Sequence, residues 1–318
     1  DYFKVWKEKR IVFEIIPVLK IKHPREEKNV TDLSYFHVNY VKRKTRGDKI
    51  NREIRIAKKF CKSNGFYGAE SYIQGFSGYG LECLIIHYRS FEKFVKEMIK
   101  VKNRLIIDPE RAYKKGEVEL ELNESKLQGP VVLVDPSWKE RNVLAALSKD
   151  TFEKFQERLR EFVKKPDISF FEEKEIDEIL LKSKAKKKKG EFLKIKIKTG
   201  KQEGDIAGTK LKKFSRFLEQ EIGKSFDVLE SEFEYDLGSK ADIYLVLKSK
   251  GEIIRKGPPV KMEKHAKAFG KENKKVFVKG GKLYSKIKIV GNSNGFVVAW
   301  LKKNKKVVRE MGITGLEV

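Results

Sequence analysis

A single acidic residue interrupts an apolar segment near the start of the chain. Glu14 stands in residues 11–18 among six apolar neighbours. A buried carboxylate is costly unless a metal ion or another cation neutralises its charge. Glu14 is therefore either a metal ligand or an acid on an edge strand that points to solvent.

Two donor side chains of different chemistry are suited to phosphate. Lys58 belongs to a helical pattern over residues 49–64, and Tyr67 stands between two glycines in residues 65–68. Ammonium and phenol groups donate hydrogen bonds to phosphate oxygens, and a glycine-flanked turn lets them approach closely. The alternatives are a solvated lysine on a helix surface and a tyrosine that only packs.

A planar guanidinium follows an Asp-Pro turn signal. Residues 135–142 read Asp-Pro-Ser-Trp-Lys-Glu-Arg-Asn, so that Arg141 follows Asp135 at short range. The rigid fork of donors on arginine suits planar acceptor groups. In the alternative interpretation Asp135 caps a turn and Arg141 pairs with an acid at the surface.

Hydrophobic periodicity predicts the elements that hold these residues. Strands are expected at residues 11–18 and, before them, at 2–5. A helix is expected at 49–64, and a second one starts after Ser90, which can cap it. Residues 103–130 are expected to form a strand and loop excursion. A third helix is expected to begin at Asp150, with Glu153 completing a cap-like pair, and to end before Pro166.

The second half of the chain has a different composition. The acidic residues 172–178 lead into the lysine run 184–190, which we interpret as a solvated linker or loop. Strict alternation predicts a half-buried strand at 193–198, and the same pattern returns at 282–289 after a Gly280-Gly281 hairpin turn. Between them we expect a helix at 206–222, strands at 228–235 and 243–247, and a short helix after residue 259.

The overall composition is that of a folded and strongly basic protein. The 318 residues carry a formal net charge of +26, with 40% hydrophobic and 11% aromatic residues. Such an excess usually serves a polyanion, although a lysine-rich proteome is the alternative explanation. Cys61 and Cys83 lack any Cys-x-x-Cys spacing, which argues against a disulfide framework or a zinc site. No apolar run reaches the roughly 18 residues of a membrane span, and we predict a cytoplasmic protein.

Two stretches carry a resemblance to a known family. Residues 65–91 read GFYGAESYIQGFSGYGLECLIIHYRSF, with two glycine-aromatic turns before an apolar run. Together with residues 135–148, they resemble the central domain of archaeal-type (class I) CCA-adding tRNA nucleotidyltransferases, and the resemblance covers nearly the whole chain. In that family a strand ending in proline carries the third of three carboxylates that hold two magnesium ions. The resemblance therefore implies that Glu14, where the family usually has aspartate, is a catalytic metal ligand.

The resemblance also implies a nucleotide pocket. Ser34 and His37 take the places of a threonine and a histidine near the incoming nucleotide, although a lone histidine beside a phenylalanine is often simply packed. Lys58 and Tyr67 match residues that contact the nucleotide triphosphate. Arg141, followed by Asn142, matches the arginine that reads the base edge of CTP or ATP.

The basic C-terminal half is expected to bind RNA. Residues 182–213 contain 13 lysines and three acids. Such a surface engages RNA phosphates in a salt-dependent manner, whereas the alternative is a solvated charge run. The expected contacts are Lys194, Lys196 and Lys198 on a strand and Lys210, Lys212, Lys213 and Arg216 on the following helix.

Two elements of the family are missing from these 318 residues. A Gly-Ser turn that binds the triphosphate and an Asp-x-Asp strand that supplies the first two carboxylates do not occur. We therefore expect the chain to be part of something longer and, taken alone, to be inactive. The alternatives are a non-catalytic tRNA/RNA-binding protein, one chain of a split nucleotidyltransferase, and a related RNA polyadenylating enzyme.

The predicted fold is a multidomain α+β protein. Residues 1–46 are expected to be the end of a nucleotidyltransferase sheet, 47–165 a helical central domain with the nucleotide pocket, and 166–318 an α+β body and tail with antiparallel strands. The predicted reaction adds CMP, CMP and AMP to the tRNA 3′ end without a template, from CTP and ATP, and releases pyrophosphate. It uses Mg²⁺ as cofactor. The partners are the tRNA acceptor stem and top half, with no membrane, and a homodimer is left open.

Overall fold

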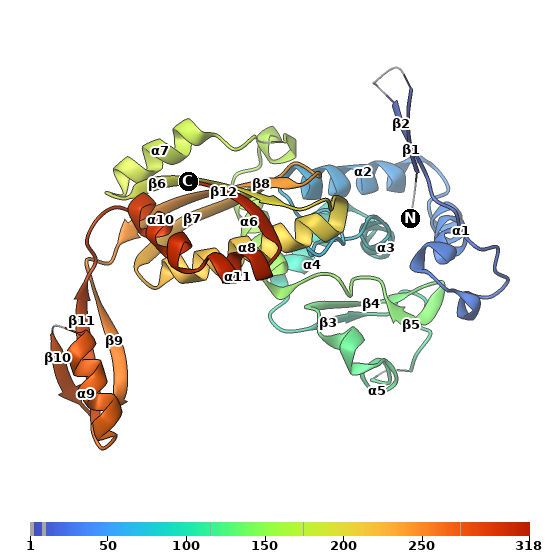
Figure 1. The fold of residues 1–318 in the computed structure, drawn as a ribbon. Helices are drawn as coiled ribbons and strands as arrows, with labels where there is room; N and C mark the ends of the chain where they lie inside the picture. The colour runs from blue at the N-terminus through green and yellow to red at the C-terminus, as the bar shows by residue number, and fades with distance from the viewer. Residues whose placement is uncertain (1–2, 8–10, 115, 174, 274) are drawn as a thin grey trace. The chain divides into compact units, whose positions relative to one another are not determined.

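The computed structural model describes residues 3–7, 11–114, 116–173, 175–273 and 275–318. The chain divides into two compact units, residues 1–174 and residues 175–318. Figure 1 shows helices in both units and several separate sheets, in which antiparallel pairs predominate. This mixture confirms the predicted multidomain α+β class. Among the described residues, no helix is both long and apolar enough to cross a membrane.

The first unit contains a hairpin, a group of packed helices and a small three-stranded sheet. Its strands and α-helices are β1 (Phe3–Lys7), β2 (Ile11–Ile15), α1 (Ser34–Lys44), α2 (Asp48–Ser63), α3 (Gly78–Tyr88), α4 (Phe91–Lys100), β3 (Leu105–Ile107), α5 (Val118–Glu121), β4 (Val131–Asp135), β5 (Trp138–Asn142) and α6 (Lys149–Lys164). Four short 3-10 helices join them: η1 (Pro24–Glu26), η2 (Val30–Leu33), η3 (Glu124–Leu127) and η4 (Ile168–Phe171).

The N-terminal hairpin confirms a strand within each of the segments expected at residues 2–5 and 11–18, of which residue 2 lies outside the described residues. The second strand is shorter than expected, because β2 ends at Ile15, ahead of Pro17, which lacks the N–H group that strand pairing uses. β1 and β2 are antiparallel, with Phe3 opposite Ile15 and Val5 opposite Phe13. These four side chains share one face because alternate residues of a strand point the same way. The face is apolar and exposed: Phe3 is 64% and Ile15 is 54% accessible to solvent.

Phenylalanine rings form the core that holds the helices of the first unit. Phe60 of α2, Phe76, Phe94 of α4 and Phe155 of α6 are fully buried. The Phe155 ring centroid lies 4.7 Å from that of Phe76 and 5.9 Å from that of Phe94. Since aromatic rings bury a large area and prefer such tilted contacts, they fix the helices against one another. α2 confirms the helix predicted at 49–64.

The apolar run that follows the glycine-aromatic turns is helix α3. Six of its eleven residues are buried: Gly80, Leu81, Cys83, Leu84, Ile85 and Ile86. A helix that is apolar on most sides belongs in a core. It ends at Arg89, whose φ of 70° is left-handed. Ser90 then caps α4 by accepting a hydrogen bond from the backbone N–H of Lys93, as predicted.

The start of α6 differs from the prediction. Its cap is Ser148, which accepts a hydrogen bond from the backbone N–H of Thr151 at 3.2 Å. The expected start at Asp150 with Glu153 was therefore wrong, because the serine two residues earlier satisfies the free N–H groups of the first turn.

Residues 103–130 were predicted to form a strand and loop excursion. Strand β3 lies within them and belongs to a small sheet with β4 and β5. β4 lies between β3, to which it is parallel, and β5, to which it is antiparallel. All five residues of β4 are buried. Its last residue, Asp135, is therefore an acid held at the end of an apolar strand.

The second unit contains a four-stranded sheet, a three-stranded sheet and five helices among its described residues. The elements are α7 (Glu178–Lys187), β6 (Glu191–Thr199), α8 (Gly204–Gly223), β7 (Phe226–Tyr235), β8 (Lys240–Ser249), β9 (Glu252–Pro259), α9 (Glu263–Glu272), β10 (Val276–Lys279), β11 (Lys282–Lys288), α10 (Ser293–Lys303), α11 (Lys305–Glu310) and β12 (Ile313–Glu317). The larger sheet has the order β12-β6-β8-β7, and its neighbouring strands are antiparallel.

Helix α8 covers one face of the larger sheet. Its Leu211, Phe214 and Leu218 pack with Ile195 of β6 and Ile243 of β8 in one buried cluster. β6 confirms the alternating strand predicted at 193–198, and α8 confirms the helix predicted at 206–222. The alternation works because odd-numbered residues of β6 enter this cluster while its lysines take the other face.

The lysine run was predicted wrongly as a linker or loop. Residues 178–187 form α7, in which Leu181 and Ala185 are buried against Tyr244 and Val246 on the second face of the sheet. These two residues are four apart and form an apolar stripe on one side of the helix. The lysines occupy the remaining sides of the helix. Because they outnumber the apolar residues, the sequence alone suggests a solvated segment.

The smaller sheet, of order β10-β11-β9, packs with α9. Gly280 and Gly281 both have left-handed φ values, 55° and 70°, and join β10 to β11, which confirms the predicted hairpin turn. Strand β9 was not predicted. A Cβ atom on its Gly257 would stand 2.8 Å from the ring of Phe269 in α9. Only glycine lets the helix come this close to the strand.

Candidate nucleotide-binding site

Asp135 is the centre of a polar cluster in the first unit. Its Oδ1 atom accepts hydrogen bonds from the backbone N–H of Ser137 at 2.8 Å, from the Ser137 hydroxyl at 2.7 Å and from the Tyr79 hydroxyl at 3.2 Å. Its Oδ2 atom lies 3.1 Å from Nη1 of Arg141 and 3.2 Å from Nε2 of His37. Four elements or turns therefore meet at one carboxylate.

The charge of Asp135 is sustained by these partners. Its side chain has no exposed surface. Burial alone would raise the pKa of the Asp135 carboxyl, but hydrogen bonds from His37 and Ser137 outweigh that effect and hold the pKa below its ordinary value. The carboxylate is therefore ionised and fixes the groups around it.

His37 is sandwiched between this carboxylate and an aromatic ring. Its ring stacks on Tyr79, with centroids 3.9 Å apart and planes 19° from parallel. Nε2 of His37 also lies 3.0 Å from Nη1 of Arg141. In a neutral imidazole this nitrogen either donates to Asp135 or accepts from Arg141, so the two contacts are alternatives. Burial raises the pKa of Tyr79 far above its usual range, which keeps its hydroxyl protonated as a donor.

Arg141 extends from β5 with its side chain 23% exposed. Within the part of the chain that the structure describes, the bonds of its guanidinium all use Nη1. The Nε and Nη2 donors of the fork remain available for a ligand. The sequence offered an acidic partner at the surface as one alternative for Arg141, and its partner is instead the buried Asp135.

Lys58 and Tyr67 meet at the first turn of α3. A Cβ atom on Gly78 would stand 2.8 Å from the Tyr67 hydroxyl and 3.9 Å from Nζ of Lys58. Lys58 pairs with Glu82, one turn further along α3, at 2.5 Å. The backbone supports this arrangement, since Tyr67 forms an isolated bridge with Phe76 between the two glycine-aromatic turns.

This second cluster has the features of an anion site. The first turn of a helix presents backbone N–H groups and a partial positive charge, which suit phosphate oxygens. An ammonium and a phenol stand beside that turn. The next residue, Tyr79, reaches Asp135. The first turn of α3 therefore joins the anion site to the Asp135 cluster.

Ser34 and Asn142 lie near these clusters without entering their bonds. Ser34 begins α1, one turn before His37, is exposed, and donates to the carbonyl of Thr31 at 2.6 Å. Asn142 is buried, and its side chain bonds to backbone atoms: its Oδ1 accepts from the N–H groups of Leu133 and Leu144, and its Nδ2 donates to the carbonyl of Lys126. These bonds join β4 to the loop that follows β5.

Glu14 lies in β2 opposite Lys4. Its side chain is outside the described part of the structure. Among the side chains that are described, no group of three or more His, Cys, Asp and Glu residues could hold a metal ion. The described residues therefore do not by themselves supply a complete magnesium site.

The lysines predicted to bind RNA differ in their surroundings. Lys194 is paired with Glu178 at 2.7 Å and with Asp242 at 3.0 Å, and it lies over the ring of Tyr244. These carboxylates raise its pKa above the ordinary value. Lys196 and Lys198 follow on the same strand and are exposed.

The helix lysines also form two groups. In α8, Lys213 and Arg216 are exposed and one turn apart. Lys210 is half-buried and donates to Gln202, and Lys212 lies over the ring of Phe233 with its ammonium 4.4 Å from the centroid.

Tyr79 and Glu82 were not among the predicted site residues. Tyr79 bonds to Asp135 and stacks on His37. Glu82 is the partner of Lys58. The available signal was their position in the first turn and a half of α3, directly after the glycine-aromatic turns.

Comparison with known proteins places these clusters in a recognised domain. Residues 52–172 match the family described as tRNA nucleotidyltransferase, second domain. That range contains Lys58, Tyr67, Tyr79, Asp135 and Arg141. His37 and Glu14 precede it.

Curated relatives extend the likeness. The CCA-adding enzyme of Nanoarchaeum equitans is 41% identical over 153 residues, which are 48% of this chain and 38% of the relative. The CCA-adding enzyme of Thermococcus gammatolerans is 28% identical over 92% of this chain and 65% of its own length. That of Archaeoglobus fulgidus is 30% identical over 87% and 62%. The chain thus spans less than two thirds of the length of each of these relatives. Most of the chain is thus similar to archaeal CCA-adding enzymes, and its residues 52–172 match the second domain of tRNA nucleotidyltransferases.

Proposed function

We propose that this chain forms the nucleotide-selecting and tRNA-binding part of a CCA-adding tRNA nucleotidyltransferase. The reaction adds CMP, CMP and AMP to the tRNA 3′ end from CTP and ATP and releases pyrophosphate. The observation that carries the proposal is the arrangement at α3: a phosphate-type site at Gly78 and a guanidinium cluster at Tyr79 are adjacent. A nucleoside triphosphate has the corresponding two ends.

The triphosphate would bind at the first turn of α3. Lys58 supplies an ammonium, Tyr67 a phenol and the helix its free N–H groups. In this site Glu82 keeps the lysine oriented when no phosphate is present, because it holds the ammonium in an ion pair. When a triphosphate binds, its phosphate oxygens accept hydrogen bonds from the remaining N–H groups of the Lys58 ammonium.

Arg141 would select the base. Its Nε and Nη2 atoms present donors, whereas Asp135 holds Nη1. Cytosine N3 and adenine N1 are acceptors at the edge used in base pairing, whereas uracil N3 and guanine N1 carry hydrogens. A fixed row of donors therefore accepts the first two bases and leaves unpaired donors against the other two, which is costly in a desolvated site.

Magnesium would supply the stabilisation of phosphate charge and of the leaving pyrophosphate. Glu14, which lies in β2 at the position that the family resemblance assigns to a carboxylate ligand, is the proposed ligand on this chain. The roles proposed here for Lys58, Tyr67 and Arg141 are binding and orientation.

The tRNA would contact the second unit through the exposed members of the predicted set. Lys196, Lys198, Lys213 and Arg216 are exposed, in line with contacts to phosphates. Ser34, at the start of α1 near His37, is proposed to approach the nucleotide, and Asn142 to support the loop after β5. The two buried free thiols suit the reducing cytoplasm as the location.

The test is calorimetric titration of the chain with CTP, ATP, UTP and GTP in a magnesium buffer. CTP and ATP are expected to bind at least about tenfold more tightly than UTP and GTP, a difference of about 1.4 kcal/mol. Arg141→Ala is expected to remove that preference while weak binding of all four remains. Lys58→Ala is expected to weaken all four alike.

Lys59→Ala is the matched control, because Lys59 is on the same helix but pairs with Glu173 away from Gly78. It is expected to leave all four affinities unchanged. Equal binding of the four nucleotides would contradict the base-selection proposal. Binding of a tRNA acceptor minihelix with no nucleotide binding would instead favour a non-catalytic RNA-binding protein.

A further inference from the structure

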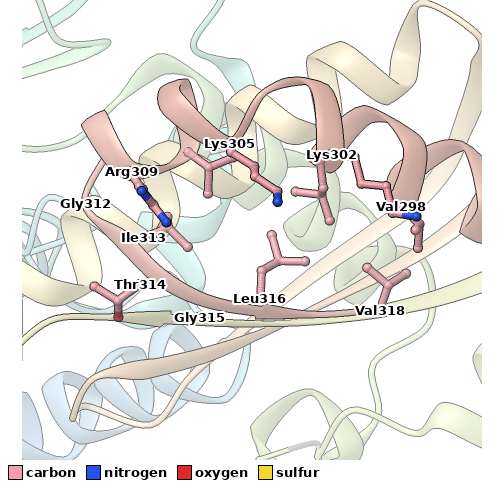
Figure 2. Close-up of a pocket in the computed structure, with 12 residues that line it drawn as sticks. Val298, Lys302, Lys305, Arg309, Gly312, Ile313, Thr314, Gly315, Leu316 and Val318 are labelled. Atoms are coloured by element: carbon pink, nitrogen blue, oxygen red, sulfur yellow. The ribbon is translucent and has the colours of Figure 1, made fainter.

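An apolar groove lies in the second unit between strand β12 and helices α10 and α11. It has a volume of about 720 Å³. Figure 2 shows Leu316 pointing from β12 toward the helices, while the Lys305 side chain extends from the helix side above it. Val298, Leu301 and Val308 also line the groove. Its surface is therefore mainly aliphatic.

Positively charged side chains also line this groove. Lys302, Lys305 and Arg309 line it, and its described lining residues include no Asp or Glu. Throughout the described residues, none of these three cations forms an ion pair. The neighbouring Lys306, which does not line the groove, lies near Glu310 at 3.9 Å. The groove thus combines aliphatic walls with uncompensated positive charge.

One side of the groove is an edge strand. β12 is the first strand in the sheet order β12-β6-β8-β7, and among the described strands its partner in that sheet is β6. An edge strand offers N–H and C=O groups to an added strand, and pockets beside it accept the alternate side chains of that strand. The geometry is thus suited to an extended peptide.

The walls argue against single-stranded RNA as the occupant. Proteins hold unpaired bases by stacking them on aromatic rings, and none of the residues described as lining the groove is aromatic. Trp300 of α10 is turned elsewhere, since it packs on Phe217 and donates to Glu221. Phosphates alone gain nothing from aliphatic walls, whereas apolar peptide side chains do.

We propose that this groove binds an extended segment of another protein, with apolar side chains between acidic ones. The apolar side chains occupy the space between Leu301, Val308 and Leu316. The acidic side chains pair with Lys302, Lys305 and Arg309, and the backbone adds to the free edge of β12. This site is separate from the residues assigned to the nucleotide.

The experiment uses a fluorescein-labelled decapeptide of alternating leucine and glutamate, titrated with the whole chain at physiological ionic strength and followed by anisotropy. Saturable binding is expected. Arg309→Glu and Lys305→Glu are each expected to weaken it about tenfold. Lys306→Glu, with the same charge change on the same helix, is expected to alter it less than twofold. A decapeptide of alternating leucine and glutamine is expected to bind at least about tenfold more weakly.

Three outcomes would overturn the proposal. Equal losses in Arg309→Glu and Lys306→Glu would mean general attraction to a basic protein. An acceptor-stem minihelix whose binding depends on Arg309 while the peptide does not bind would make the groove an RNA site. A concentration-dependent dimer in sedimentation that Arg309→Glu abolishes, with no peptide binding, would make it a contact between two copies of this chain.

Discussion

Asp135 and Arg141 form an ion pair of 3.1 Å in which the carboxylate is fully buried and the guanidinium is partly exposed. The acid therefore acts as a fixed anchor, and the arginine presents its remaining donors outward. Removal of one partner from such a pair leaves an uncompensated charge, which is more harmful than the net value of the pair suggests.

Asp135→Asn tests this anchor through pH. The folded-state pKa of Asp135 is lowered, so its contribution to the free energy of unfolding is present above the unfolded pKa, near 3.9, and is lost as pH falls through the lower folded value. At pH 7 the variant is expected to be less stable by about 1 to 3 kcal/mol. The difference should shrink in urea unfolding curves below pH 4. A gap that is independent of pH would contradict the role of the charge.

Tyr79→Phe removes one hydrogen bond and keeps the ring that stacks on His37. The expected loss of stability is about 1 kcal/mol, and the preference for CTP over UTP should fall because Asp135 is held less firmly. Thermal unfolding and nucleotide titration measure the two effects. Tyr35→Phe is the control, since Tyr35 is 69% exposed on α1. An unchanged preference would remove Tyr79 from the positioning of the site.

Gly78→Ala tests the phosphate end of the site alone. The new Cβ atom would stand 2.8 Å from the Tyr67 hydroxyl and must displace it. Affinity for CTP is expected to fall about tenfold, or 1.4 kcal/mol, while affinity for cytidine stays the same. Gly223→Ala, where a Cβ meets nothing within 4 Å, is the control. A parallel loss for cytidine would mean that the substitution disturbs the whole domain.

Leu181→Ala tests the helix found in the lysine run. Leu181 is buried against the sheet, and its truncation should lower the free energy of unfolding by about 2 to 3 kcal/mol. Ile179→Ala on the same helix should change it by less than about 0.5 kcal/mol, since Ile179 is 81% exposed. Denaturant unfolding of both variants gives the comparison. Equal small effects would restore the interpretation as a solvated segment.

The helices around the site could be predicted from the sequence because their signals are local. The stripe in α2 and the cap at Ser90 each lie within one or two turns, and so does the turn chemistry around Tyr67. The resemblance drew attention to His37 and Arg141, and the structure brings the two together. Local patterns and the family resemblance thus identified most of the helices and residues of the candidate site.

The hydrogen bonds between the residues of the site could not be predicted from the sequence. His37 and Asp135 are 98 residues apart, and Tyr79 and Asp135 are 56 apart. No local pattern reports which distant side chains share a carboxylate. In α7 the signal was local but weak. Two apolar residues among many lysines form the packing contacts with the sheet, and the high charge of the segment led to the wrong prediction of a solvated linker or loop.

Lys194 has a consequence for measurements of RNA binding. Its charge is already balanced by Glu178 and Asp242 within the protein. The logarithm of an RNA binding constant falls with the logarithm of salt concentration in proportion to the number of phosphates that the protein neutralises, because each releases condensed counterions. A lysine that is neutralised internally adds nothing to that slope, so the slope counts fewer cations than the sequence contains.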